Sequence, residues 1–166
     1  MAKVKIQGSA SGTGILSVVA PNTSTDRTIT LPDATMTIPE YTTGSWTPTL
    51  SSNFTATISD NKYVRIGNLV NLWVKLGNIQ INGASGALTL SNIPFTQGTA
   101  EMVGGNSMLN YVNISGGSTY NIAIYLTGNA LYIYRSEDNS EWTAIGENVL
   151  SDNDDLYINM TYYTEA

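Results

Sequence analysis

The residue types that most enzymes use for nucleophilic and metal chemistry are missing from this sequence. It contains no histidine and no cysteine. Ser-His-Asp and Cys-His nucleophile systems are therefore excluded, together with zinc sites of the ordinary ligand types. The sequence Gly12-Thr13-Gly14 lacks the lysine and the following helix of a phosphate-binding loop. Catalysis by paired carboxylates, as in glycoside hydrolases, is not excluded, but enzymes that cut polysaccharides need an extended groove and are generally much longer. We expect no enzymatic activity and no cofactor.

Two acidic segments gather oxygen-bearing side chains. Ser151–Asp155 contains three aspartates, and calcium takes about six to eight oxygen ligands. The segment lacks the glycine and glutamate spacing of an EF-hand, so we interpret it as a solvated loop before the last strand, with a calcium site as the alternative. Glu137–Glu141 is interpreted as a hairpin tip between Tyr134 and Trp142, with ion binding as the alternative. No metal site is expected.

Aromatic side chains offer the other functional possibility, because tyrosines are concentrated in the second half of the chain. Tyrosine buries a large ring and keeps a polar end, which suits it to interfaces. We interpret the tyrosines on the non-core phase of their strands as a subunit interface, with ordinary core and glycan contact as alternatives. These tyrosines are Tyr125, Tyr132, Tyr134 and Tyr157. Trp142 and Tyr134 are the candidate glycan contacts.

The composition limits the partners of the chain. Its 166 residues are 42% hydrophobic and 12% charged, with a net charge of −6, whereas a typical soluble domain is about 25% charged. The seven basic residues are scattered, so neither nucleic acid nor a membrane surface is an expected partner. The N-terminus lacks the apolar region of a signal peptide, and no apolar run approaches the ~20 residues of a membrane span. We expect a protein made in the cytoplasm without an export signal.

The dominant sequence period is two residues, which is typical of strands. Leu156, Ile158, Met160 and Tyr162 alternate with more polar residues, and Leu72, Val74 and Leu76 share a face in the same way. Short turn signals separate such runs. These signals are Gly67-Asn68, Gly77-Asn78, Asn82-Gly83, Gly104-Gly105, Gly116-Gly117 and Gly128-Asn129. Of these, Asn82-Gly83 and Gly128-Asn129 are placed as two-residue hairpin loops would be. The pattern predicts an all-β protein, an antiparallel β-sandwich or jelly roll with an extended N-terminal arm.

The first forty residues differ from the rest because their apolar stretches are only about five residues long and are bounded by Gly or Pro. We place a boundary at Pro39-Glu40, with an attachment or oligomerisation arm of short strands over 1–40 and the sandwich over 41–166. Such stretches need the main domain, a neighbouring subunit or another protein. The candidate contact residues in the arm are Ile15, Val18, Ile29 and Leu31.

Two stretches resemble segments of tailed-phage fibre and decoration proteins. Gly12–Pro21 followed by Arg27–Thr35 is similar to an element with an apolar strand, Ala-Pro, a Thr-rich strand and Leu-Pro-Asp-Ala-Thr. Gly44–Leu50 followed by Tyr63–Val70 resembles the Gly-x-Trp-Thr-Pro-x-Leu and Tyr-x-Lys-Ile-Gly-Asn-x-Val pattern of small phage β-sandwich modules. Arg65 stands where lysine is more usual. The resemblance covers residues 12 to 70, less than half of the chain.

The second stretch also has a physical interpretation of its own. Pro48 removes a backbone donor, so the strand that leads to Trp46 is expected to be an edge strand or to end there. We expect Trp46 to be a core residue or a plug at the end of the sheet, with ligand contact as the alternative. Gly67-Asn68 is predicted to join two strands as a hairpin.

The resemblance implies a homotrimer on the virion surface that serves as a head decoration, a head fibre or a receptor-binding tip. Our preferred interpretation is a trimeric capsid decoration, cement or short head-fibre protein that binds the major capsid protein or another virion protein through its arm. The short length and the initial Met1 favour a stand-alone accessory protein. The alternative is a tail-fibre tip that contacts host surface polysaccharide.

Overall fold

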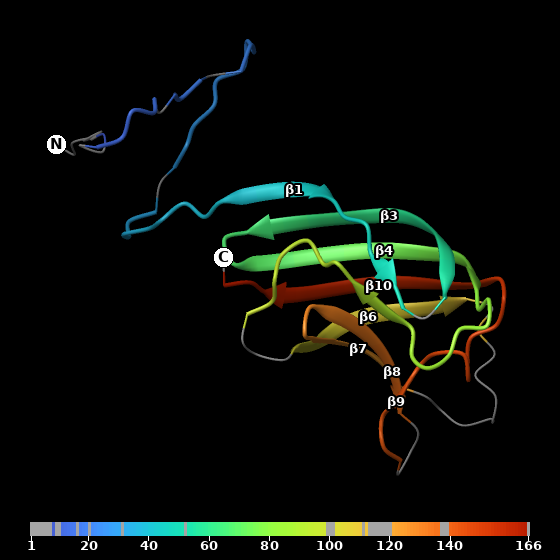
Figure 1. Cartoon of the computed structure of the whole chain (residues 1–166). Coiled ribbons are helices and arrows are strands. Elements are labelled where there is room, and N and C mark those ends of the chain that lie inside the picture. Colours follow the sequence, from blue (N-terminus) through green and yellow to red (C-terminus); the bar gives the residue numbers. More distant parts are fainter. Residues whose placement is uncertain are drawn as a thin grey trace. The chain divides into compact units, whose positions relative to one another are not determined.

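Every regular element of the described chain is a strand (Figure 1). The computed structural model describes residues 8, 11–15, 17–19, 21–30, 32–51, 53–98, 102–110, 112, 121–136 and 140–165, with backbone only for 102–104. The strands are β1 (Tyr41–Ser45), β2 (Thr49–Leu50), β3 (Thr55–Ile66), β4 (Leu69–Gln80), β5 (Thr89–Ser91), β6 (Met102–Asn110), β7 (Asn121–Thr127), β8 (Ala130–Ser136), β9 (Thr143–Ala144) and β10 (Asp154–Tyr163).

The chain divides into two units, Met1–Thr37 and Ile38–Ala166. The expected boundary at Pro39-Glu40 lies two residues beyond this division. Among the described residues of the first unit there is no strand, whereas short strands were expected in the arm. A strand exists only by pairing its backbone with another strand, and the described part of the single chain supplies no such partner.

The second unit is a single antiparallel sheet of ten strands. The strand order is β1-β3-β4-β10-β6-β7-β8-β5-β2, with β9 beside β8. In Figure 1, β1, β3, β4 and β10 run side by side, and the sheet then curls through β6, β7 and β8 into a half-barrel. The all-β prediction is therefore confirmed. Where a sandwich or jelly roll was expected, the chain forms one continuous, curled antiparallel sheet.

The core lies on the inner, concave face of this sheet, because apolar residues at every second position point there. Val70, Leu72, Val74 and Leu76 of β4 are at most 3% exposed. The predicted row of β10 is buried in the same way: Leu156, Ile158, Met160 and Tyr162.

Trp46 follows β1, which lies at one end of the strand order, so the predicted edge position is confirmed. Its side chain is 5% exposed, and Nε1 donates a hydrogen bond to the carbonyl oxygen of Trp73 at 3.3 Å. The indole is therefore a core group, as predicted.

Two of the predicted hairpin turns are confirmed. Gly67-Asn68 joins β3 to β4 with Ile66 opposite Leu69, and Gly128-Asn129 joins β7 to β8. Gly128 and Asn129 both have positive φ values, 56° and 63°, as a type I′ turn requires. Asn82-Gly83 also forms a tight turn with two positive φ values, but it follows β4 without joining two paired strands. That hairpin prediction is wrong. Gly116-Gly117 lies outside the described residues.

The other two predicted turns are wrong, because both glycine pairs lie inside strands. Gly77-Asn78 belongs to β4, where the register shifts against both neighbouring strands. Gly104-Gly105 belongs to β6, where the register against β7 shifts. A Cβ atom on Gly105 would lie 2.6 Å from the carbonyl oxygen of Asn159 and from the Cβ of Ile124. These glycines permit bulges and close strand packing rather than turns.

Candidate functional site

The outer face of β1, β3, β4, β10 and β6 carries the side chains that alternate with the core rows. Residues directly opposite each other in antiparallel strands point to the same face, so the strand register defines rows across this face. Three features stand out on the second unit: an apolar row at one end, a groove around Trp73, and a separate tyrosine cluster on β7 and β8.

The apolar row comprises Tyr41, Ile66, Leu69 and Tyr163. Tyr41 pairs with Ile66, Ile66 with Leu69, and Leu69 with Tyr163, so the four residues lie in one line across four strands. Their exposed fractions are 69%, 48%, 40% and 59%. Single exposed apolar residues are ordinary, but a contiguous set is typical of a surface that meets a partner.

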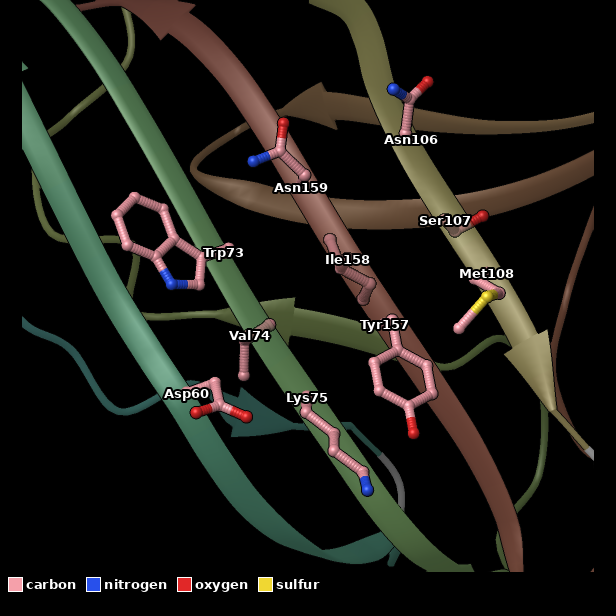
Figure 2. A pocket seen from close by; sticks show the side chains of 10 residues that line it. All are labelled: Asp60, Trp73, Val74, Lys75, Asn106, Ser107, Met108, Tyr157, Ile158 and Asn159. Carbon is pink, nitrogen blue, oxygen red and sulfur yellow. The ribbon is translucent and has the colours of Figure 1, made fainter.

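The Trp73 groove has a volume of about 300 Å³. Trp73 pairs with Asn159, which pairs with Asn106, and in the next row Lys75 pairs with Tyr157, which pairs with Met108. Figure 2 shows these side chains on three neighbouring strands, with Asp60 on β3 at the margin. Asp60 has a φ of 52° at a point where the register of β3 shifts, so a bulge directs this carboxylate toward the groove.

Lys75 is the basic group of the groove, and its charge is locally balanced. Its Nζ lies 3.8 Å from Oδ2 of Asp155 and 5.1 Å from the centre of the Tyr157 ring. The pKa of Lys75 is raised above its usual value, mainly by a side-chain hydrogen bond with Tyr157 and with further contributions from Asp155 and Asp60. The ammonium therefore stays protonated at neutral pH and is already engaged by its neighbours.

The tyrosine cluster lies on the non-core face of the β7–β8 hairpin. Tyr125 and Tyr132 are directly paired, and the rings of Tyr125 and Tyr134 meet edge to face at 5.9 Å between centres. Tyr134 also stacks on Tyr132 at 6.2 Å. Ala123, Tyr125, Tyr134 and Trp142 line a hollow of about 220 Å³, and Trp142 is 51% exposed. The predicted glycan contacts, Trp142 and Tyr134, are therefore neighbours.

The acidic segment Ser151–Asp155 is held by the chain's own backbone. Asp152 Oδ1 accepts a hydrogen bond from the Ile81 N–H at 2.9 Å, and Asp155 Oδ1 accepts one from the Asn78 N–H at 2.9 Å. Asp154 is 2% exposed, and its Oδ2 accepts the Ser151 N–H at 2.7 Å. Within the described residues, no three acidic side chains converge on one point. Of the second acidic segment, 137–139 lie outside the described residues.

The contact residues predicted in the arm are strongly exposed. Ile15, Val18 and Ile29 are 91%, 85% and 81% exposed, while Leu31 lies outside the described residues. The structure thus divides the predicted partner residues among three places: these arm residues, the tyrosine cluster, and Tyr157 in the Trp73 groove.

Sequence reasoning missed Trp73 and the apolar row. A signal for Trp73 was present, because Leu72, Val74 and Leu76 on the core face place Trp73 and Lys75 on the opposite face. A signal for half of the row was also present, since a two-residue turn at Gly67-Asn68 sets Ile66 opposite Leu69.

Comparison with protein-family models, with curated proteins and with solved structures finds no match. The resemblance of residues 12 to 70 to phage modules therefore stays a prediction from the sequence. No described segment forms a helix with the length and apolar character that a membrane crossing requires.

Proposed function

We propose that this chain is a non-enzymatic structural protein of a tailed-phage virion, a trimeric capsid decoration or short head-fibre protein that attaches through its N-terminal arm. The observation that carries the proposal is the exposure of the arm's apolar side chains. Ile15, Val18 and Val19 are each at least 82% exposed. A partner that covers these side chains removes apolar surface from water, which is thermodynamically favourable.

The apolar row supports self-association of the second unit. It is contiguous over four strands and contains no lysine, arginine or carboxylate, as is typical of the core of a homomeric interface. Tyr41, at the start of the row, follows Ile38, which is 78% exposed. The arm and the row are therefore close in the sequence.

The proposed mechanism is mechanical. Three arms in one trimer engage equivalent sites on the particle, and the later contacts form at the high effective concentration that the first one creates. No single contact has to be strong. This agrees with an arm whose apolar stretches are short and separated by polar residues.

Two measurements on the full chain test the proposal. Light scattering after size-exclusion chromatography is expected to give three times the chain mass of 17.8 kDa, about 53 kDa. The purified protein is also expected to bind particles that lack it. The combined variant Ile15→Ser, Val18→Ser and Ile29→Ser removes three of the arm's exposed apolar side chains and is expected to abolish this binding.

A matched control changes polar neighbours in the same arm, Ser17→Ala and Thr30→Ser, and is expected to bind as the parent does. A parent protein that fails to bind particles contradicts the proposal. Equal binding by the triple serine variant and the parent would show that the arm is not the attachment element.

The runner-up function is a receptor-binding tip that contacts host polysaccharide. It is favoured by the tyrosine cluster, where the half-exposed Trp142 borders a hollow of about 220 Å³ with Tyr125 and Tyr134. Binding to host polysaccharide that is lost in Trp142→Ala and in Tyr134→Ala would support it.

A further inference from the structure

We propose that the Trp73 groove is a binding site for a neutral oligosaccharide. This proposal does not rest on the virion assignment, and it concerns a different part of the sheet's outer face from the tyrosine cluster. Trp142, which borders that cluster, is absent from the groove lining. The groove instead runs over β3, β4, β10 and β6 (Figure 2).

The groove combines the two kinds of group that a sugar requires. A sugar ring has an apolar face of C–H groups, which packs on aromatic rings, and a rim of hydroxyl groups, which both donate and accept hydrogen bonds. Trp73 and Tyr157 supply rings that are neither fully buried nor fully exposed, each with an apolar body and a polar end. Asn106 and Asn159 are exposed beside them, and each amide can donate and accept at once.

The amide nearest to Trp73 is held in position before any ligand arrives. Asn159 lies directly opposite Trp73, and its Nδ2 donates to Oδ1 of Asn71 at 3.4 Å. Asn71 is itself fixed, because its Nδ2 donates to Oγ1 of Thr161 at 2.7 Å. A polar group that is already ordered loses less conformational entropy on binding.

The charge of the groove favours a neutral sugar over an acidic one. Lys75 is its only basic lining residue, and Asp155 and the Tyr157 ring already engage the ammonium. Asp60 contributes a negative charge at the margin. Within this lining, a carboxylated or phosphorylated sugar would meet only the engaged ammonium of Lys75 and would face a carboxylate. Lys62, opposite Trp73 on β3, lies outside the lining and donates to Ser45 Oγ at 2.8 Å.

The composition of the groove suits a protein interface less well than the composition of the apolar row does. Interface cores are depleted in lysine, aspartate and serine. The groove lining includes Lys75, Asp60 and four side chains with amide or hydroxyl groups, whereas the apolar row has no charged side chain. A subunit contact through the groove is accordingly an outcome that the experiment must detect.

The test is a titration of the full-length protein with three neutral probes, cellohexaose, maltohexaose and chitohexaose, by isothermal calorimetry. At least one probe is expected to bind. Trp73→Ala and Asn159→Ala are each expected to weaken that binding, by about tenfold or more for the loss of the ring. Asn121→Ala is the control, because it removes an exposed amide that lines neither the groove nor the tyrosine cluster, and it is expected to leave the affinity unchanged. Trp142→Ala tests the tyrosine cluster instead.

Circular dichroism and thermal unfolding of each variant show whether it is folded, and Asn159→Ala keeps the test valid if Trp73→Ala fails to fold. Absence of binding by all three probes overturns the proposal. Binding that is lost in Trp142→Ala and kept in Trp73→Ala also overturns it.

A second measurement excludes a subunit contact. Met108 is 59% exposed and lines the groove, and Met108→Arg is expected to leave the mass in solution unchanged. A fall of the mass to that of a monomer would assign the groove to an interface between copies and overturn the proposal.

Discussion

Tyr162 is the bulkiest of the fully buried side chains, and its polar end is satisfied by a single residue of another segment. Its hydroxyl donates to the carbonyl oxygen of Phe95 at 2.9 Å and accepts from the N–H of Phe95 at 3.3 Å. Burial raises the pKa of Tyr162 to about 12, although the backbone hydrogen bond with Phe95 lowers it. One hydroxyl therefore links the last strand to the loop after β5.

This residue gives a prediction for stability at high pH. In the unfolded chain a tyrosine has a pKa of about 10, so between pH 10 and 12 the unfolded state releases a proton that the folded state keeps. The contribution of Tyr162 to the free energy of unfolding is therefore fully present below pH 10 and is lost as the pH rises toward 12. Tyr162→Phe is expected to flatten this fall and to cost about 1–3 kcal/mol at pH 7, since Phe95 loses both hydrogen bonds.

Urea unfolding at pH 7, 10 and 11.5 measures both effects. Equal pH slopes in Tyr162→Phe and the parent would contradict the prediction.

The β7–β8 hairpin depends on its turn residues, because both Gly128 and Asn129 have positive φ values. Left-handed backbone costs a residue with a Cβ atom about 1–2 kcal/mol. Gly128→Ala is therefore expected to lower the free energy of unfolding by about 1 kcal/mol, measured by urea unfolding. Gly14→Ala is the control, since no atom lies near its new methyl group and its φ is not positive. A Gly128→Ala variant as stable as the control would contradict the left-handed backbone at Gly128 in the β7–β8 turn.

The sequence was sufficient for local features of the elements and insufficient for features set by distant partners. Alternation predicted the buried rows of β4 and β10, and the Gly-Asn pairs predicted two hairpins. Gly77-Asn78 and Gly104-Gly105 looked like turns, because a bulge uses the same residue type as a turn and only the neighbouring strand distinguishes them. The groove could not be predicted, since Trp73 and Asn159 meet only when β10 inserts beside β4.

At the scale of the whole molecule, the apolar row makes a prediction about the forces that hold the proposed trimer. Raising NaCl from about 0.1 M to 1 M shortens the Debye length from about 10 Å to about 3 Å. The mass by light scattering is expected to stay constant, because the row has no charged side chain. Ile66→Glu places a charge in the row and is expected to release monomers, while Thr43→Glu in the adjacent row serves as the control. Dissociation of the parent by salt alone would show that charge pairs hold the assembly.

The position of β10 has a consequence for synthesis. This strand comes last in the chain, yet it lies in the middle of the sheet between β4 and β6. While the C-terminal segment is still inside the ribosome, β4 has no second neighbour, and the two halves of the half-barrel cannot join. The sheet therefore cannot be completed before β10 has left the ribosome, and a premature stop codon before Asp154 divides the sheet internally instead of trimming its edge.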